Sequence, residues 1–250
     1  MTIKTGRVAI VTGAGSGIGR GIANGLAEEG AYVIVADINF TNATKVADEI
    51  KALGFEATPV YTDVSKAVDC ENMVKTAVDT YGTVDILVNN AGLLRDALIH
   101  KMTEEQWDLV QDVILKGAFL CTRAAIKIMK EKKYGRIINI SAEGQIGYRG
   151  QANYGSAKAG LISLTRVIAA EYSWCGVTAN CILPGPIITP MALGALNGKW
   201  KETIEKIHPM GHAGQPSDIA YMAKIFVAEE ADYITAQMIS VGGGWDLVRY

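Results

Sequence analysis

The chain has 250 residues, a formal net charge of −2 and 49% hydrophobic residues. One α/β domain of this length is ordinary and can bury a large core. The near-neutral charge, with both signs interspersed, argues against a nucleic-acid surface or a membrane patch. No stretch approaches the roughly 20 apolar residues of a membrane span, so we expect neither nucleic acid nor membrane as a partner.

Cysteine and histidine positions give no sign of a metal site or a disulfide framework. The four cysteines lack C-x-x-C spacing, which is typical of free thiols in a reducing compartment. We therefore expect a cytoplasmic protein with no metal. The cysteines are Cys70, Cys121, Cys175 and Cys181, and the scattered histidines are His100, His208 and His212.

The chain opens with an apolar strand and a glycine-rich turn, and a helical pattern follows at once over residues 19–29. Gly13 allows a tight turn, Gly17 lets backbone N–H groups approach a pyrophosphate, and Gly19 lets the helix pack closely on the sheet. The helix N-terminus adds unpaired N–H donors and a partial positive charge. Alone, such a turn is also typical of an ordinary strand–helix connection.

The next strand, residues 32–36, ends at Asp37, about 20 residues beyond the glycine turn. A carboxylate at this position can accept hydrogen bonds from both ribose hydroxyls of an adenosine, and it repels a 2′-phosphate. Neither Ser16, Ile38 nor Asn39 supplies a cation for that phosphate. The sequence therefore favours NAD over NADP.

Strands and helices alternate along the rest of the chain. We predict helices over residues 41–53, 67–81, 103–132, 152–173 and 216–228, and strands over 57–61, 84–88, 136–140, 177–182 and 236–241. This alternation predicts one domain, residues 1–250, with a three-layer doubly wound parallel sheet, the Rossmann fold. Ligands of such sheets bind at the carboxyl ends of the strands. Residues 187–210 break the pattern, and we interpret them as a substrate flap.

A second group of residues carries catalytic chemistry. Ser141 follows a predicted strand, and Tyr154 and Lys158 share one face of a predicted helix. Because a nearby ammonium lowers the pKa of a phenol from about 10, Tyr154 can exchange a proton with a carbonyl or an alcohol. Ser141 can stabilise the same substrate oxygen. A Tyr-x-x-x-Lys pair alone is equally typical of an ordinary helix surface, so the inference depends on the combination.

Together these residues resemble the short-chain dehydrogenase/reductase family, in its single-domain branch. The resemblance spans nearly the whole chain and is nearest to the 3-oxoacyl-carrier-protein reductases at residues 94–96 and 151–154. It implies that Tyr154 is the general acid/base, that Lys158 lowers its pKa and binds the nicotinamide ribose, and that Ser141 orients the substrate. The cofactor-binding residues that it implies are Gly13, Ser16, Gly17, Ile18, Gly19, Asp37, Ile38, Asp63, Val64, Asn90, Ala91, Gly92, Tyr154, Lys158, Pro184, Gly185, Ile187 and Thr189.

One position departs from the family pattern. The family carries an asparagine in a run like Asp-Val-Asn-Leu-x-Gly, and the backbone carbonyl of that asparagine holds a water linked to the lysine. Here Ile114 stands at that place. An isoleucine can close the helix and expel the water. The change fits a tolerated variation with rerouted proton transfer, an engineered substitution, or a decayed or retuned site.

The pocket beside these residues is predicted less sharply. Apolar walls are expected from Leu93, Gln145, Ile146, Met191 and Leu193. Tyr148 and Arg149 fit either a pocket wall or a solvated loop.

We therefore predict NAD-dependent hydride transfer between nicotinamide and a secondary alcohol or ketone, with 3-oxoacyl compounds among the candidate substrates. The alternative is an NAD-binding protein whose turnover is impaired or lost because of Ile114. Sugar-nucleotide epimerisation fits less well, since such relatives carry an extra substrate domain, and enoyl reductases space Tyr and Lys further apart. The resemblance also implies a homotetramer, a dimer of dimers, with residues 103–132 and 152–173 in a dimer interface.

Overall fold

Seven parallel strands form one continuous sheet in the order β3-β2-β1-β4-β5-β6-β7. The computed structural model describes residues 3–194 and 199–247, without the side chains of Gln145 and Ile146. The strand order reverses between β1 and β4, which is the ligand-binding point of doubly wound sheets. The strands are β1 (Val8–Thr12), β2 (Tyr32–Asp37), β3 (Ala57–Tyr61), β4 (Ile86–Asn89), β5 (Gly135–Ile140), β6 (Val177–Pro184) and β7 (Met238–Val241).

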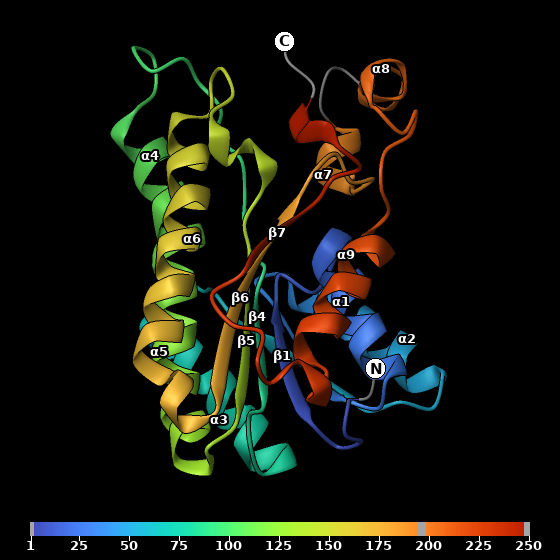
Figure 1. Ribbon diagram of the computed structural model, residues 1–250, viewed down its shortest axis with the longest axis vertical. Helices are drawn as coiled ribbons and strands as arrows, with labels where there is room; N and C mark the ends of the chain where they lie inside the picture. Colours follow the sequence, from blue (N-terminus) through green and yellow to red (C-terminus); the bar gives the residue numbers. More distant parts are fainter. Residues whose placement is uncertain (1–2, 195–198, 248–250) are drawn as a thin grey trace.

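Helices cover both faces of the sheet, which confirms the predicted three-layer fold (Figure 1). One layer holds α1 (Gly17–Glu28), α2 (Phe40–Ala52) and α9 (Pro216–Val227). The other holds α3 (Ala67–Tyr81), α4 (Glu104–Gln111), α5 (Gly117–Lys132) and α6 (Ala152–Tyr172). The short α7 (Pro190–Leu193) and α8 (Trp200–Ile207) lie beyond one end of the sheet. No helix in the described part of the chain is both long and apolar enough to cross a bilayer.

The central strands β1 and β4 are apolar over most of their length because each is buried on both faces. In β1, Ala9 and Val11 belong to the core beneath α1 and α9, whereas Val8 and Ile10 belong to the core beneath α3 and α5. Successive side chains of a strand point to opposite faces, so a continuous apolar run serves two cores at once. This burial fixes the sheet, and with it the positions of the strand ends.

The predicted single helix over residues 103–132 is wrong in its middle. It begins as expected at Thr103, whose side chain and backbone form a reciprocal capping box with Gln106 at 3.2 and 3.0 Å. A π-helical turn, Asp112–Lys116, then separates α4 from α5. The sequence conceals this turn because Val110, Ile114 and Ala118 keep the four-residue apolar spacing of a continuous helix and share one buried cluster.

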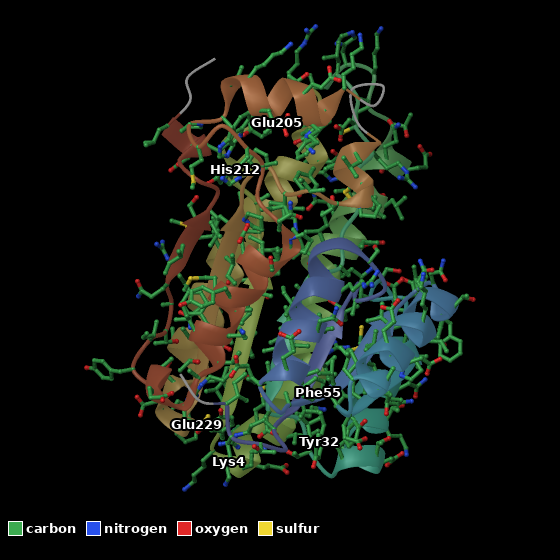
Figure 2. The ribbon with its side chains drawn as sticks, turned by 90° about the vertical axis from the view of Figure 1, so that its right-hand side faces the viewer. Lys4, Tyr32, Phe55, Glu205, His212 and Glu229 are labelled. Carbon is green, nitrogen blue, oxygen red and sulfur yellow. The ribbon has the colours of Figure 1, made fainter. Side chains whose placement is uncertain are left out.

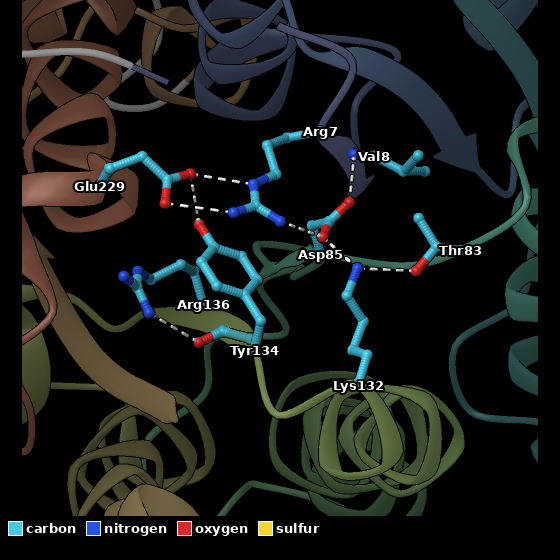
Figure 3. A network of polar contacts seen from close by, with 9 residues as sticks. Arg7, Val8, Thr83, Asp85, Lys132, Tyr134, Arg136 and Glu229 are labelled. Atoms are coloured by element: carbon cyan, nitrogen blue, oxygen red, sulfur yellow. Dashed lines mark hydrogen bonds and ion pairs between the residues drawn. The ribbon is translucent and has the colours of Figure 1, made fainter. Parts of the chain in front are cut away.

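The two ends of the sheet differ in chemistry. In Figure 2, His212 and Glu205 lie at the end of the molecule where α8 crosses, and Glu229 and Lys4 lie at the opposite end. That opposite end carries a charged network (Figure 3), in which Arg7 donates to both Glu229 and the buried Asp85. The network joins residues from distant parts of the chain, far from the carboxyl ends of the strands.

Candidate active site

A cavity of about 630 Å³ opens at the carboxyl ends of the strands. Its walls include all of the predicted catalytic and cofactor-binding residues with one exception, Gly19. The residues thus brought together are Gly13, Ser16, Gly17, Ile18, Asp37, Ile38, Asp63, Val64, Asn90, Ala91, Gly92, Ser141, Tyr154, Lys158, Pro184, Gly185, Ile187 and Thr189.

The glycine turn is clamped from the neighbouring strand end. Asn90 Nδ2 donates to the carbonyls of Thr12 and Gly13 at 2.9 and 3.3 Å, and Thr12 Oγ1 accepts from the backbone N–H groups of Asn90 and Ala91. Gly19 does not line the cavity but packs behind the turn, where a methyl group would lie 2.2 Å from the Gly13 carbonyl oxygen. Only glycine therefore lets α1 pack against the turn.

The start of α1 suits a pyrophosphate. Ser16, at the N-cap, makes no side-chain cap hydrogen bond, so it does not occupy the first-turn N–H groups of α1. These groups meet the cavity together with the positive end of the helix dipole. Gly13 and Gly17 both have positive φ angles, +63° and +53°, which a side chain would strain.

Asp37 lines the cavity, and its carboxylate can accept more hydrogen bonds than it receives within the chain. Its Oδ2 accepts from the backbone N–H of Gly15 and its Oδ1 from that of Asn39, both at 2.8 Å. A carboxylate has about four lone-pair sites, so further hydrogen bonds remain available for ribose hydroxyls. Among the described wall residues the single cation is Lys158, against four carboxylates: Asp37, Asp63, Asp96 and Glu143. The residues present fit an adenine dinucleotide.

The three predicted catalytic side chains meet in the same cavity. Ser141 follows the end of β5, and its Oγ donates to the backbone carbonyl of Lys158 at 2.7 Å. Lys158 Nζ donates to the carbonyl of Ile140 at 2.6 Å and lies 5.6 Å from the ring centroid of Tyr154. Tyr154 and Lys158 are on one face of α6, as the four-residue spacing predicts.

The protonation of Tyr154 differs from the sequence prediction. Burial raises the pKa of the Tyr154 phenol above its ordinary value, and the charge of Asp96 raises it further. We expected Lys158 to lower that pKa. Instead burial lowers the pKa of Lys158 itself to about 8, and its ammonium is directed at the Ile140 carbonyl. In this structure the phenol therefore holds its proton at neutral pH, the form that donates to a carbonyl oxygen.

Ile114 does not close the helix. It lies inside the π-helical turn, and its carbonyl accepts a hydrogen bond from the Gly117 N–H. Its side chain is 2% exposed, in an apolar cluster against which Tyr154 packs. The isoleucine side chain thus makes the surroundings of Tyr154 apolar, whereas the asparagine of the family pattern would place a polar amide there.

Asn153, which belongs to the run 151–154 of the resemblance, positions the start of α6. It is fully buried, and its Nδ2 donates to the carbonyls of Arg95 and Gln106 at 3.0 and 3.1 Å. Its Oδ1 accepts from the Tyr154 N–H at 2.8 Å. It thus ties the start of α6 to α4 and to the loop before it. Its place beside Tyr154 was the only available signal.

A polar ladder braces the sheet beneath the cavity. Asn89 Nδ2 donates to Asn139 Oδ1, and Asn139 Nδ2 donates to Thr165 Oγ1, both at 2.8 Å. These bonds connect β4, β5 and α6 within the core. They hold the strand ends at a fixed spacing, because buried polar groups are costly when unpaired.

The predicted flap contributes a wall of the cavity. From α7, Met191 lines it, and from α8, Trp200 and Ile204 do. Residues 195–198 of the predicted flap lie outside the described residues. The flap's movement stays a prediction.

The other residues predicted for the pocket do not all line it. Leu93, like Met191, lines the cavity as predicted, whereas Leu193 is not part of its described wall. Tyr148 also lines it, and its hydroxyl accepts from Trp245 Nε1 at 2.7 Å; Arg149 is exposed. The side chains of Gln145 and Ile146 fall outside the described part of the structure.

Within the described ranges, no three His, Cys, Asp or Glu side chains gather in a way that would hold a metal. All four cysteines are free and buried.

Comparison with known proteins identifies the family. Residues 13–246 match the family described as Enoyl-(Acyl carrier protein) reductase. The chain is 42% identical to a 3-oxoacyl-[acyl-carrier-protein] reductase from Synechocystis sp., over 98% of each chain. The chain belongs to the short-chain dehydrogenase/reductase family.

Further relatives of this short-chain dehydrogenase/reductase agree. The chain is 39% identical to (2S)-[(R)-hydroxy(phenyl)methyl]succinyl-CoA dehydrogenase subunit BbsD from Thauera aromatica, over 96% of this chain and 97% of that one. A solved structure of levodione reductase matches 98% of this chain and 99% of its own, with a TM-score of 0.92 and 31% identity. These relatives are named as reductases or dehydrogenases, and the family uses nicotinamide cofactors.

Proposed function

We propose that this protein is an NAD(H)-dependent oxidoreductase that acts on a secondary alcohol or the matching ketone. One observation carries the proposal. A single cavity holds Ser141, Tyr154 and Lys158 together with Asp37 and the glycine turn. A protein that only binds the nucleotide has no physical need for a buried phenol, hydroxyl and ammonium at the same place.

The residues divide the work. A bound nicotinamide supplies or accepts the hydride. Tyr154 donates its proton to the carbonyl oxygen in reduction and takes a proton from the alcohol in oxidation. Ser141 turns its hydroxyl from the Lys158 carbonyl to the substrate oxygen, where negative charge develops. Lys158 binds the nicotinamide ribose and holds positive charge near Tyr154.

The proposed substrates are 3-hydroxyacyl and 3-oxoacyl thioesters. Support comes from the relatives, which are named for a 3-oxoacyl-carrier-protein and for a hydroxy(phenyl)methylsuccinyl-CoA. The apolar wall formed by Leu93, Met191 and Trp200 suits an acyl chain or ring. The name of the matched family raises enoyl reduction as another reaction, so an enoyl thioester belongs in any substrate panel.

Asp37 supports NAD as the cofactor. Its carboxylate stands at the end of β2 and lines the cavity, where a 2′-phosphate would meet negative charge. The described cavity wall offers that phosphate no arginine or lysine near Asp37, since its cation is Lys158, beside Tyr154.

Replacing the proposed acid/base tests the proposal. Tyr154→Phe removes the proton that the reaction needs, so kcat should fall by about 10²–10⁴-fold. NADH binding, measured by fluorescence titration, should change far less. The substrates are a 3-hydroxyacyl thioester with NAD, its 3-oxo form with NADH, and the enoyl thioester. Equal turnover by the variant, or turnover of the enoyl compound alone, would contradict the assignment.

The alternative, an NAD-binding protein without turnover, predicts a different result. The unchanged protein would bind NADH but leave every thioester untouched, and Ile114→Asn would restore activity. A π-helical turn at Ile114, of a kind that is frequent at functional sites, supports turnover by the chain as it stands.

The proposal extends to assembly as a homotetramer and to a reducing, cytoplasmic setting. Two separate surfaces carry exposed apolar side chains, Phe119 and Val167 on α5 and α6, and Tyr221 and Ile239 on α9 and β7. A dimer of dimers needs contact surfaces on two sides of each subunit. Sedimentation equilibrium tests this, and a monomer would contradict it. Four buried free thiols support the reducing setting.

A further inference from the structure

Glu143 is a buried carboxylate in the cavity wall to which the proposed reaction gives no task. It lies two residues after Ser141 and opens the short 3₁₀ turn Glu143–Ile146. The residue is only 3% exposed and lines the same cavity as Ser141 and Tyr154. Charged side chains are almost never buried without a partner, so this position needs an explanation.

One of the two carboxylate oxygens has no partner. Oε1 accepts from the Ser240 hydroxyl, whereas Oε2 is buried and makes no hydrogen bond within the described structure. The charged groups around it do not compensate, because Asp246 is another acid. Burial accordingly raises the pKa of Glu143. An unpaired acceptor of this kind costs free energy until a donor arrives.

The backbone around Glu143 makes room for it and holds it still. A methyl group on Gly242 would lie 2.1 Å from Oε1, and one on Gly185 would lie 2.7 Å from Oε2. The Gly242 carbonyl is in turn bonded to His208 Nε2 at 2.9 Å. The carboxylate is therefore confined between the ends of β6 and β7 and cannot turn to solvent.

The wall beside Glu143 is aromatic. The rings of His208 and Trp245 stack with centroids 5.7 Å apart, and Trp245 Nε1 donates to the Tyr148 hydroxyl. Trp245 and Tyr148 line the cavity with Glu143. Glu143 Oε2 is thus a buried acceptor without a hydrogen bond, in a cavity wall whose neighbouring side chains are aromatic.

We propose that Glu143 is a specificity-determining residue whose Oε2 accepts a hydrogen bond from a donor group, a hydroxyl or an ammonium, beside the reacting carbon of the substrate. This rests on the proposed function, since it concerns the alcohol that the enzyme turns over. Substrates with such a donor gain a charge-assisted hydrogen bond, and substrates without one leave the buried oxygen unpaired. Within the proposed thioesters, it selects those that carry this second polar group.

Three matched alcohols test the proposal: 2-butanol, 2,3-butanediol and 3-amino-2-butanol, each with NAD. A hydrogen bond to a charged acceptor predicts that kcat/KM for the diol or the amino alcohol exceeds that for 2-butanol by about 10–100-fold. Glu143→Leu should abolish this preference and leave 2-butanol turnover within a few-fold. Glu143→Gln keeps an acceptor without charge, so it should retain a preference for the diol and lose one for the amino alcohol.

A matched control is Glu205→Gln on the exposed surface of α8, which should change no ratio. The same three alcohols are also titrated into the NADH complex by calorimetry, which reads the preference without turnover. Turnover of neither these alcohols nor a 3-hydroxyacyl thioester would count against the proposed function, while the calorimetric preference still decides on Glu143. The inference is wrong if Glu143→Leu keeps the wild-type ratios of kcat/KM. It is also wrong if the variant lowers all three rates equally together with the melting temperature, because Glu143 would then only stabilise the fold.

Discussion

At the residue scale, the surroundings of Tyr154 decide in which form the phenol works. Burial and Asp96 raise its pKa, and the apolar Ile114 cluster packs against it. Oxidation of an alcohol needs the phenolate, which forms only as the pH rises towards that raised pKa. Reduction of a ketone uses the protonated phenol, which is present throughout the neutral range.

The first prediction follows from that environment. Ile114→Asn puts a polar amide beside Tyr154, so the pH at which alcohol oxidation reaches half its maximum should fall, by about one unit. Ketone reduction at pH 7 should change little. The pH profiles of kcat for both directions measure this, with Ile114→Val as the apolar control. Identical oxidation profiles for Ile114→Asn and the wild type would exclude this role of the side chain.

Lys158 gives a second prediction, about stability. Its pKa is about 8 in the folded protein and 10.5 in the unfolded chain, so the unfolded state binds more protons between these values. The free energy of unfolding should therefore rise from pH 8 to pH 10.5. Below pH 8 it is lowered by the full cost of burying the charged ammonium. Lys158→Met should remove that rise and stabilise the cofactor-free protein at pH 7, by up to about 3 kcal/mol.

Urea unfolding of both proteins at pH 7 and pH 10 measures it. Lys199→Met, at an exposed position, is the control and should leave the pH dependence as it is. If the wild type is equally stable at both pH values, then the charged form of Lys158 does not destabilise the folded protein at pH 7.

At the element scale, the alternation of strands and helices was predictable. Continuous apolar runs indicate buried strands, and amphipathic stretches indicate the helices that cover the sheet. The π-helical turn was not predictable, because Val110, Ile114 and Ala118 have the spacing of an unbroken helix. The contacts of Asn153 were equally hidden, since its partners are backbone carbonyls far away in the sequence.

The start of α6 gives the third prediction. Asn153→Ala removes two donors and one acceptor from the join between α6 and the loop before α4. Tyr154 then loses its fixed position, and kcat should fall by about 10²-fold while NADH affinity is kept. Asn72→Ala, on the exposed side of α3, is the control. A loss of NADH binding in step with kcat would point to general unfolding instead of positioning.

At the scale of the whole molecule, the fold separates stability from chemistry. The proposed reacting groups gather at the carboxyl ends of the strands, and the charged network of Arg7, Asp85, Lys132 and Glu229 lies at the amino ends. The cavity residues were predictable because their motifs end successive strands. Glu143, Asp85 and Tyr134 were not, because partners such as Ser240 and Glu229 come from sequence-distant segments with no motif.

Asp85 carries the fourth prediction. It is 2% exposed and accepts from Arg7 at 3.0 Å, from the Val8 N–H at 2.8 Å and from Lys132. Asp85→Ala leaves two cations facing each other without their shared anion, so the free energy of unfolding should fall by about 3–5 kcal/mol. Asp79→Ala breaks the exposed pair with Lys75 and should cost less than about 1 kcal/mol. Equal losses in urea unfolding would contradict the structural role of the network.

The most direct test of the whole account is the steady-state oxidation of a 3-hydroxyacyl thioester by the unchanged protein, with NAD and with NADP. Asp37 predicts that kcat/KM with NAD exceeds that with NADP by at least about tenfold, and that Asp37→Ser narrows the gap. An equal rate with both cofactors, a preference for NADP, or no turnover by a protein that binds NADH would contradict the account.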